Sequence, residues 1–460
     1  MRKPIGTFQY QTTYQIQGSI IFLRNIEEVA YEEVVTIHLD DGTVRMGQVL
    51  QADKTATIIQ VFEGTEGMET VNTKVEFTQD VFKVGIAKQM IARSMNGLGV
   101  PIDDLGPLIP EKLVPVSGSP LNPVRREPSE NFIETGISVI DGLNSLVQGQ
   151  KLPIFAGSGL PTSELAARIA VQSRLRGSKT ELTVIFAAMG ITEREGAYFR
   201  KTFEAASTAN IAFFSNFAQD SIVERLLTPR VALTFAEYLA FELDFPVLVI
   251  LTDMLNYSEA LREISATREE FPGRRGYPGY LYTDLASIYE RAGKLKGSEG
   301  SITLVPIVTM PNDDITHPVP DLTGFITEGQ LVLSRDLFNR LIFPPLNPLP
   351  SLSRLMHAGI GKEKTKEDHA SLANQLYAAY AKGTQFRQLA SITGKESLSA
   401  REQQYLEFAD QFERKFIHQG EAVRSIETTL KQGWNMLTLL PKADLNRIPQ
   451  RYIEKYYPGD

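Results

Sequence analysis

Apolar and polar residues in the first part of the chain form short runs that are typical of β-strands. Val34–Leu39, Val44–Leu50 and Thr57–Phe62 are each rich in β-branched and other apolar residues. Asp41-Gly42 lies between the first two runs and is a strong signal for a tight hairpin turn. Closely spaced short strands separated by turn residues predict a small β-barrel or β-sandwich up to about residue 75.

From about residue 76 to residue 350 the pattern changes to strands that alternate with helices. The apolar runs Val247–Leu251 and Ile302–Val308 are continuous, as expected for strands that are buried on both faces of a sheet. Leu152–Ala156 and Leu182–Ala188 are further strand candidates, and one of the helices is expected near Thr234–Leu243. This order of elements predicts an α/β domain with a parallel, doubly wound sheet.

The chain turns helical after the proline-rich segment Pro344–Pro350. Ser399 and Glu402 form a capping-box pattern at the start of a helix. Two apolar stripes with helical spacing follow: Tyr405, Phe408, Ala409, Phe412 and Phe416, and then Ile426, Leu430, Trp434, Leu437 and Leu440. Such stripes normally form the packing between helices, so they predict a C-terminal helical bundle. The expected domains span residues 1–75, 76–350 and 351–460.

Composition limits the kinds of partner and chemistry. The 460 residues carry a formal net charge of −8, which argues against a nucleic acid as the main partner because phosphate binding needs clustered cations. Cysteine is absent, so there is no disulfide, thiolate metal site or cysteine nucleophile, which fits a reducing cytoplasm. No signal-peptide pattern is present, and no apolar run approaches the roughly 18 residues of a membrane span. Any membrane association is therefore expected to run through partner subunits.

Residues 151–164 have the context of a phosphate-binding loop but lack its chemistry. An apolar strand leads into Gly157 and a helix starts near Ser163, as in the G-x-x-x-x-G-K-[ST] motif. The degenerate loop consists of Gly157, Ser158, Gly159, Leu160, Pro161, Thr162, Ser163 and Glu164. Ser163 stands where the phosphate-binding lysine would be, and Glu164 replaces the hydroxyl residue that holds Mg²⁺. Pro161 also removes one backbone N–H, so we expect a nucleotide-binding scaffold whose own site is disabled.

Asp253 follows the apolar run Val247–Leu251 and resembles the aspartate of a Walker B strand. That aspartate contacts Mg²⁺ through water at the carboxyl end of its strand. A structural role as a helix cap explains Asp253 equally well. The residue is therefore expected to be a degenerate Walker B position or a cap.

The segment after Met189 carries a second loss. Its register matches the Gly-Glu-Arg-x-Arg-Glu-Gly motif of catalytic subunits of rotary ATPases at Gly190 and at residues 194–196. Ile191 stands where the glutamate that polarises the attacking water would be, and Thr192 replaces the next arginine. An alkyl side chain cannot accept a proton or orient water. Two separate requirements of catalysis, the lysine that binds phosphate and the glutamate that polarises water, are thus missing from motifs that otherwise align.

Two polar loops invite other interpretations. The first is dense in glycine, proline and arginine and contains Gly273, Arg274, Arg275, Gly276, Tyr277, Pro278 and Gly279. The acidic chain makes a nucleic-acid contact unlikely for this loop. The second, Asn312-Asp313-Asp314, has no regular spacing of metal ligands, so we expect a turn with structural aspartates and no metal.

The run from Pro344 to Arg354 begins with prolines and closes in Ser351-Leu352-Ser353-Arg354, and it matches the signature of ATPase α and β subunits. Together with Asp321–Gly324 and Ile326–Gln330, these motifs closely resemble the B subunit of V/A-type rotary ATPases, from the barrel region to Tyr457. The fold of that family is a β-barrel, a RecA-like P-loop-type α/β core with a parallel sheet, and a helical C-terminal domain. This fold agrees with the three regions found above.

The resemblance implies a regulatory, non-catalytic subunit. Three copies would alternate with three catalytic A subunits in a ring around a central rotor stalk, with peripheral stalk subunits as further partners. ATP or ADP with Mg would bind at the A–B interface, mainly to the partner and not tightly to this chain alone. Arg354 would complete that site in trans as an arginine finger, because a guanidinium presents a planar, permanently charged fork to phosphate oxygens. The subunit would help couple ATP hydrolysis or synthesis to rotor rotation and to Na⁺ or H⁺ transport.

The resemblance also assigns roles to other residues and a location to the chain. Phe325 and Ser353 correspond to positions near the interface nucleotide, although buried aromatic packing explains Phe325 nearly as well. The loop of residues 273–279 would face the rotor. The complex would lie peripherally at the cytoplasmic face of a membrane.

Other classes of function fit less well. An autonomous catalytic ATPase requires Lys at position 163 and Glu at position 191, and the α subunit of F-type synthases generally keeps an intact loop. A hexameric nucleic-acid translocase is disfavoured by the acidic balance. A structural module that binds no nucleotide, with a purely structural Arg354, remains open from sequence.

Overall fold

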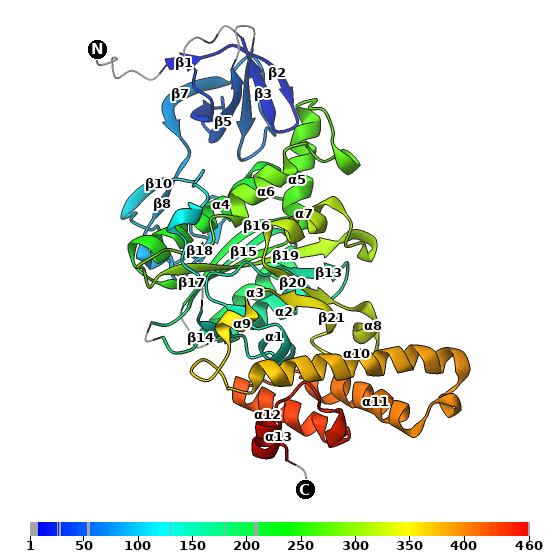
Figure 1. The fold of residues 1–460 in the computed structure, drawn as a ribbon. Helices are drawn as coiled ribbons and strands as arrows, with labels where there is room; N and C mark the ends of the chain where they lie inside the picture. Colours follow the sequence, from blue (N-terminus) through cyan, green and yellow to red (C-terminus); the bar gives the residue numbers. More distant parts are fainter. Residues whose placement is uncertain are drawn as a thin grey trace.

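The computed structural model describes residues 8–458, apart from residues 25, 27–28, 53–55, 129, 179 and 207–209. A β-domain, an α/β domain and a helical domain follow one another along an elongated molecule (Figure 1). The expected fold class is therefore confirmed.

The N-terminal domain is one antiparallel sheet of seven strands in the order β1-β7-β4-β5-β6-β3-β2. The strands are β1 (Phe8–Tyr10), β2 (Thr13–Gln17), β3 (Ile20–Leu23), β4 (Glu33–His38), β5 (Val44–Ala52), β6 (Thr57–Val61) and β7 (Lys74–Val81). β4 and β5 form the predicted hairpin, and the Thr43 backbone N–H donates to the Asp41 carboxylate at 2.8 Å in the turn. β7 crosses residue 75, where the end of the first domain is expected.

The central domain is built on a nine-stranded sheet in the order β21-β20-β13-β19-β17-β15-β16-β9, with β18 paired to β19. The strands are β9 (Ser94–Asn96), β13 (Ile154–Gly157), β15 (Thr183–Ile191), β16 (Ile211–Phe217), β17 (Pro246–Thr252), β18 (Gly293–Lys294), β19 (Ser301–Met310), β20 (Gly329–Leu333) and β21 (Leu346–Ser353). Neighbouring strands from β20 to β9 are parallel. β21 is antiparallel to β20 and forms the edge of the sheet.

Both faces of this sheet are buried, which explains the continuous apolar runs. In β15, Val184 and Phe186 belong to one hydrophobic core, whereas Ile185 and Ala187 belong to the core on the opposite face. The helices of the first face are α2 (Thr162–Gln172) and α3 (Glu193–Ala205), and those of the second are α4 (Ile222–Glu237), α5 (Met254–Thr267) and α6 (Leu281–Tyr289). Successive β15 side chains thus anchor different layers of helices.

The C-terminal domain is a bundle of α10 (His369–Thr393), α11 (Ala400–Gln411), α12 (Ile426–Leu437) and α13 (Gln450–Tyr456). Both hydrogen bonds of the predicted capping box between Ser399 and Glu402 are present at the start of α11. The rings of Phe408, Phe412 and Phe416 stack in sequence, with centroid distances of 5.6 and 4.7 Å. The predicted stripes are therefore core positions.

The helical domain is joined to the central domain by a buried carboxylate. Glu413 is 2% exposed and forms ion pairs with Arg340, which follows α8 (Arg335–Asn339), and with Arg387 of α10. Two cations around one buried anion fix the bundle against the end of the sheet that carries β21.

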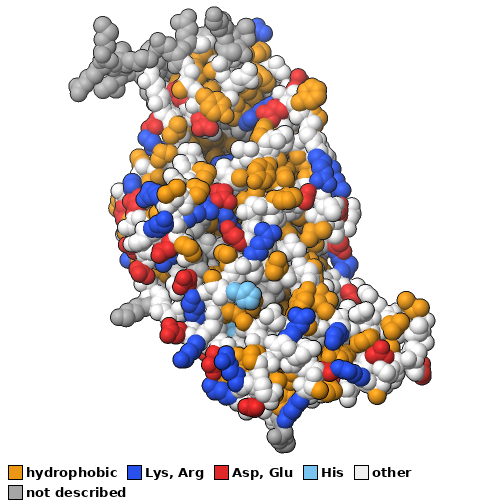
Figure 2. All heavy atoms as spheres, viewed as in Figure 1, with side chains coloured by type: hydrophobic (Ala, Val, Ile, Leu, Met, Phe, Trp, Pro, Cys, Tyr) orange, Lys and Arg blue, Asp and Glu red, His pale blue; other side chains and the backbone are white. Residues whose placement is uncertain are grey.

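The face of the molecule in Figure 2 mixes Lys and Arg with Asp and Glu, and apolar side chains lie between them. No continuous basic stripe crosses this face, in keeping with the acidic net charge. Within the described ranges, no helix has the length and apolar character needed to cross a membrane.

Candidate functional site

The degenerate loop follows β13 and leads into α2, as its strand–loop–helix context predicts. A methyl group added at Gly157 would lie 1.7 Å from a carboxylate oxygen of Asp313 and 2.6 Å from the guanidinium of Arg335. Arg335 Nε donates to Asp313 at 2.7 Å, and Arg335 Nη2 donates to the Ser158 carbonyl at 2.9 Å. The hydrogen bond from Arg335 holds the pKa of Asp313 below its ordinary value. The start of the loop is thus braced by an ion pair of the chain itself.

The other residues that replace catalytic positions also make structural contacts within the chain. The Ser163 hydroxyl donates to Glu195 at 3.2 Å, whereas Glu164 is exposed. Thr192 and Glu195 form a capping box at the start of α3, so the residue that replaces an arginine serves as a helix cap. Ile191 is 6% exposed and packs in the core. Ser163 therefore offers no cation to phosphate, and Ile191 offers no base to water.

Asp253 is the N-cap of α5, which is the structural role expected from the sequence as the alternative to a Walker B position. Its carboxylate accepts hydrogen bonds from the Leu255 backbone N–H at 2.8 Å and from the Thr309 backbone N–H at 3.1 Å, and also from the Thr309 hydroxyl. Burial raises the pKa of Asp253 above its ordinary value. A carboxylate whose oxygens already accept three hydrogen bonds within the chain has little capacity left to hold Mg²⁺.

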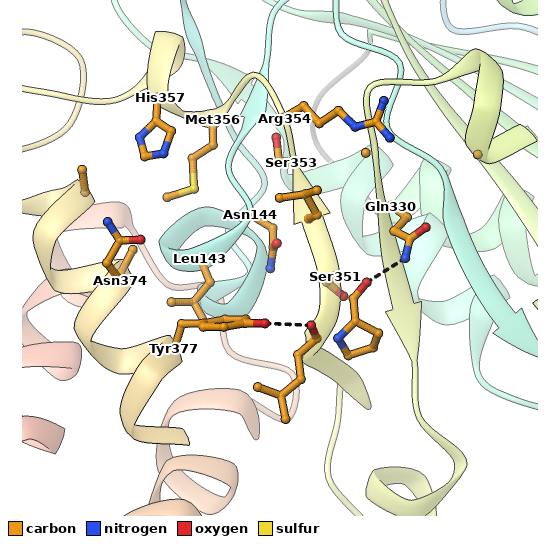
Figure 3. Close-up of a pocket in the computed structure, with 17 residues that line it drawn as sticks. Leu143, Asn144, Gln330, Ser351, Ser353, Arg354, Met356, His357, Asn374 and Tyr377 are labelled. Carbon is orange, nitrogen blue, oxygen red and sulfur yellow. Dashed lines mark hydrogen bonds between the residues drawn. The ribbon is translucent and has the colours of Figure 1, made fainter. Parts of the chain in front are cut away.

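Arg354 lies directly after β21, at the edge of the sheet (Figure 3). The strand alternates, so that Ser351 and Ser353 are buried whereas Leu352 and Arg354 are exposed. The Arg354 backbone N–H donates to the Glu328 carbonyl at 3.1 Å. Among the described residues no carboxylate forms an ion pair with the Arg354 guanidinium. The backbone is fixed and the cation is open to a ligand.

Ser353 is oriented inward. Its hydroxyl donates to the Ser145 carbonyl at 2.9 Å and accepts a hydrogen bond from Gln150 Nε2 at 3.0 Å. Both partners belong to the same chain, so the side chain of Ser353 acts on the position of β21. A direct contact of this hydroxyl with a nucleotide would require these bonds to be exchanged.

Phe325 lies near the end of α7 (Pro318–Ile326) and is 73% exposed. Buried packing therefore does not explain this residue in the isolated chain, and that interpretation from sequence is wrong. A large exposed ring with an apolar face is typical of an interface or a ligand-stacking position. Gly324, its neighbour in the chain, lines the same cavity as Arg354.

A cavity of about 540 Å³ lies between β20, β21, α7 and the first turns of α10. Its lining includes Leu143, Asn144, Gln330, Ser351, Ser353, Arg354, Met356, His357, Asn374 and Tyr377 (Figure 3). Tyr377 donates to the Leu349 carbonyl at 3.0 Å, and Gln330 Nε2 donates to the Pro350 carbonyl at 2.8 Å. Asn374 and Tyr377 were not predicted from sequence, because they come from another domain and only the folded chain brings them to β21.

The glycine- and arginine-rich loop lies between α5 and α6, and aspartates from other parts of the same chain hold its two arginines. Arg274 donates to Asp321 at 3.1 Å, Arg275 donates to Asp314 at 2.8 Å, and Tyr277 is 2% exposed. Asp313 and Asp314 are thus tied to arginines at the predicted turn η5 (Pro311–Asp313). Within the described ranges, no group of three or more potential ligands is placed to hold a metal ion.

Models of protein families match three consecutive parts of the chain. The nucleotide-binding domain of the ATP synthase alpha/beta family matches residues 136–353, and the beta-barrel domain of the same family matches residues 13–79. The C-terminal domain of V and A type ATP synthase matches residues 358–457.

Individual relatives agree with these matches. The chain is 54% identical over 457 residues to the V-type ATP synthase beta chain of two strains of Thermus thermophilus, covering 98% of this chain and 96% of each relative. Among solved structures, an ATP synthase subunit, NeqB, from Nanoarcheaum equitans has a TM-score of 0.72 at 39% identity, covering 89% of this chain and 100% of that chain.

Proposed function

The chain belongs to the ATP synthase alpha/beta family, within it to the V-type ATP synthase beta (B) subunits, and we propose that it is a non-catalytic subunit that donates Arg354 to an ATP site on a neighbouring subunit. One observation carries this proposal: Arg354 is exposed on a fixed backbone at the sheet edge, with no described carboxylate paired to it. The chain's own loop lacks the lysine and the water-polarising glutamate that catalysis would need.

The proposed assembly is the one that the family resemblance implies. Three copies alternate with three catalytic A subunits around a rotor stalk, with peripheral stalk subunits outside the ring. The ring lies peripherally at the cytoplasmic face of a membrane, and the loop of residues 273–279 faces the rotor. Nucleotide with Mg binds at each A–B interface, mainly to the A subunit, and Phe325 lies near it. Through this interface the chain helps couple ATP hydrolysis or synthesis to Na⁺ or H⁺ transport.

The residues at the end of β21 suit this role chemically. A guanidinium stays charged at all working pH values and can offer two parallel hydrogen bonds to phosphate oxygens. Charge that develops on the transferring phosphoryl group is stabilised best by a donor that needs no rearrangement at the moment of reaction. The hydrogen bond from the Arg354 N–H to Glu328 and the buried Ser353 hydroxyl hold the backbone for this purpose.

The test is steady-state ATP hydrolysis by the chain alone, by the chain assembled with its A subunit, and by the assembled Arg354→Ala variant. We expect no activity from the chain alone, activity in the assembly, and a loss of about 10³–10⁵-fold in the variant. Arg451→Ala is the matched control, because Arg451 is an exposed arginine on α13 outside the cavity of Arg354.

Size-exclusion chromatography must show that both variants assemble as the wild type does. Hydrolysis by the purified chain alone would contradict the reading of Ser163, Glu164 and Ile191 as disabling. An assembled Arg354→Ala variant as fast as wild type would leave the chain as a structural member of the ring.

A further inference from the structure

Lys151, just before β13, is a buried cation. The residue is 2% exposed, and its ammonium lies 2.8 Å from Glu290 Oε1 and 3.0 Å from Glu328 Oε1. A lysine is almost never fully buried unless it is paired, because taking its charge out of water costs several kcal/mol. The position of this ammonium therefore depends on both carboxylates.

Glu328 is held to Lys151 by the backbone as well as by the charge. The Lys151 backbone N–H donates to Glu328 Oε2 at 2.7 Å, and the Glu328 backbone N–H donates to the Lys151 carbonyl at 2.9 Å. Including the ion pair, three separate contacts join the two residues. Residue 328 can hardly move unless the start of β13 moves with it.

The same residue holds Arg354 from the other side. The Glu328 carbonyl accepts the Arg354 backbone N–H at 3.1 Å, and it accepts Gln150 Nε2 at 3.1 Å. Gln150 Nε2 also lies 3.0 Å from the Ser353 hydroxyl. Lys151 and Gln150 are neighbours in the chain, so one short segment fixes residues 328, 353 and 354 together.

The charges around Lys151 are balanced. Glu290 also pairs with Arg126, so two cations face two carboxylates. Burial acts to raise the pKa of Glu290, but the hydrogen bonds and charges of Lys151 and Arg126 together outweigh it and hold this pKa below its ordinary value. Loss of the ammonium would leave Glu328 facing Glu290 without the intervening cation, and the two carboxylates would repel each other.

We infer that Lys151 is a positioning residue for Arg354. Its ion pair with Glu328 fixes the position of the Arg354 backbone, from which the side chain reaches the ATP of the neighbouring subunit. This inference rests on the proposed function, because it needs Arg354 to act on ATP. A misplacement of about 1 Å at a reacting group can cost about 10²-fold in rate. Lys151 touches no nucleotide in this scheme and acts only through residue 354.

The test is a double-mutant cycle in the assembled complex. Lys151→Met removes the charge and keeps most of the volume, and it is made with and without Arg354→Ala. We expect Lys151→Met to lower kcat by about 10–10²-fold with little change in KM for ATP, because the finger acts in the transition state. In the Arg354→Ala background, measured by single-turnover hydrolysis, the same change should cost less than about 2-fold.

Two further variants sharpen the cycle. Lys151→Met combined with Glu328→Gln should recover part of the lost rate, because no unpaired carboxylate then remains at residue 328. Lys112→Met is the matched control, since Lys112 pairs with Glu242 at 2.7 Å but both side chains are about half exposed, at 50% and 47%. Should Lys151→Met fail to assemble, Glu328→Gln replaces it in the double-mutant cycle with Arg354→Ala. Glu328→Gln removes the ion pair with Lys151 but keeps an oxygen that can accept the Lys151 backbone N–H.

The outcomes separate this inference from the proposed function. A loss that is as large with Arg354→Ala as without it would show that Lys151 serves only the stability of the fold, and no loss at all would equally overturn the inference. In both cases a slow Arg354→Ala complex would leave the proposed function intact. An Arg354→Ala complex with the wild-type rate would overturn the proposed function and the inference with it.

Discussion

The loop after β13 and the end of β21 differ in what surrounds their polar groups. In the loop, Gly157 packs against the Asp313–Arg335 pair and Ser163 donates to Glu195, so the chain's own side chains satisfy the site. At the end of β21, Arg354 is exposed and no described carboxylate neutralises it. One region has been closed by internal contacts and the other is open to a partner.

The comparison shows that the backbone of a nucleotide-binding loop can persist when the side chains that bind the nucleotide are missing. The strand, the turn and the helix of the loop all remain, although the lysine and the hydroxyl that would bind Mg-ATP are missing. At β21 the backbone is likewise fixed by a hydrogen bond, and no described carboxylate pairs with the Arg354 guanidinium. Under the proposed function, this scaffold has lost its own site and contributes to a site that another chain completes.

Beyond Arg354→Ala, the largest effect is expected from a change that keeps the positive charge of Arg354 but not its planar guanidinium. Arg354→Lys should lose about 10³-fold in hydrolysis by the assembled complex, because an ammonium on a flexible stem cannot replace the planar fork. The rate is compared with wild type and Arg354→Ala under the same conditions. A lysine variant with most of the wild-type rate would mean that only the charge matters at this edge.

A smaller loss is expected when the backbone beneath Arg354 is displaced. Gly329 has φ +142°, and an added methyl group would lie 2.1 Å from the Leu352 carbonyl. Gly329→Ala should therefore push β20 from β21 and lower kcat of the assembled complex by about 10-fold. Gly361→Ala is the matched control, because Gly361 has φ +133° but nothing within 4 Å of the added methyl. Equal losses in both variants would assign the effect to backbone strain rather than to the contact at β21.

Asp253, the buried cap of α5, should show its burial in a modest effect of pH on stability. Burial raises the pKa of Asp253 above its ordinary 3.8, so the folded chain binds this proton more tightly than the unfolded chain does. The stability that this carboxyl contributes is thus fully present below about pH 4 and falls as the pH rises through the folded-state pKa. The urea midpoint of wild type should fall more steeply with pH than that of Asp253→Asn. Parallel curves would contradict a folded-state pKa of Asp253 above its ordinary value.

No gain is expected from restoring the lost motif alone. Ser163→Lys combined with Glu164→Thr should leave ATP hydrolysis by the isolated chain undetectable, because Ile191 still cannot polarise water. Phosphate release by the double variant is measured beside wild type, and isothermal titration calorimetry reports nucleotide binding. Measurable turnover would show that Ile191 does not prevent hydrolysis once the lysine and the hydroxyl of the loop are restored.

Sequence patterns were sufficient for the fold wherever burial was uniform. The apolar runs of β17 and β19 and the stripes of α11 and α12 follow directly from period and propensity. Helix α4 begins at Ile222, well before Thr234, where the expected helix starts. Pro229 lies inside α4, and a proline in a helix interior normally argues against a helix. Helix α4 keeps Pro229 because it packs in a buried layer.

The site was less predictable because its environment is not local. Motif register identified Arg354 and the missing lysine, but it could not show that Arg335 braces Ser158 or that Lys151 holds Glu328. These contacts join residues that are far apart in the chain. The exposure of Phe325 likewise depends on how α7 ends, which composition does not determine.

The alternation at the end of β21 makes the number of residues there a determinant of the direction in which Arg354 points. Two hydrogen bonds hold the ends of this segment, from Ser334 N–H to the Pro345 carbonyl and from Arg354 N–H to the Glu328 carbonyl. Side chains at residues 351–354 change face at every residue, so an insertion or deletion of one residue within this stretch would turn the guanidinium inward. Further back, the register of β21 with β20 shifts between Asn347 and Leu352, so the alternation is not continuous there. Residues 351–354 should therefore be less tolerant of a change in length than the part of β21 that precedes them.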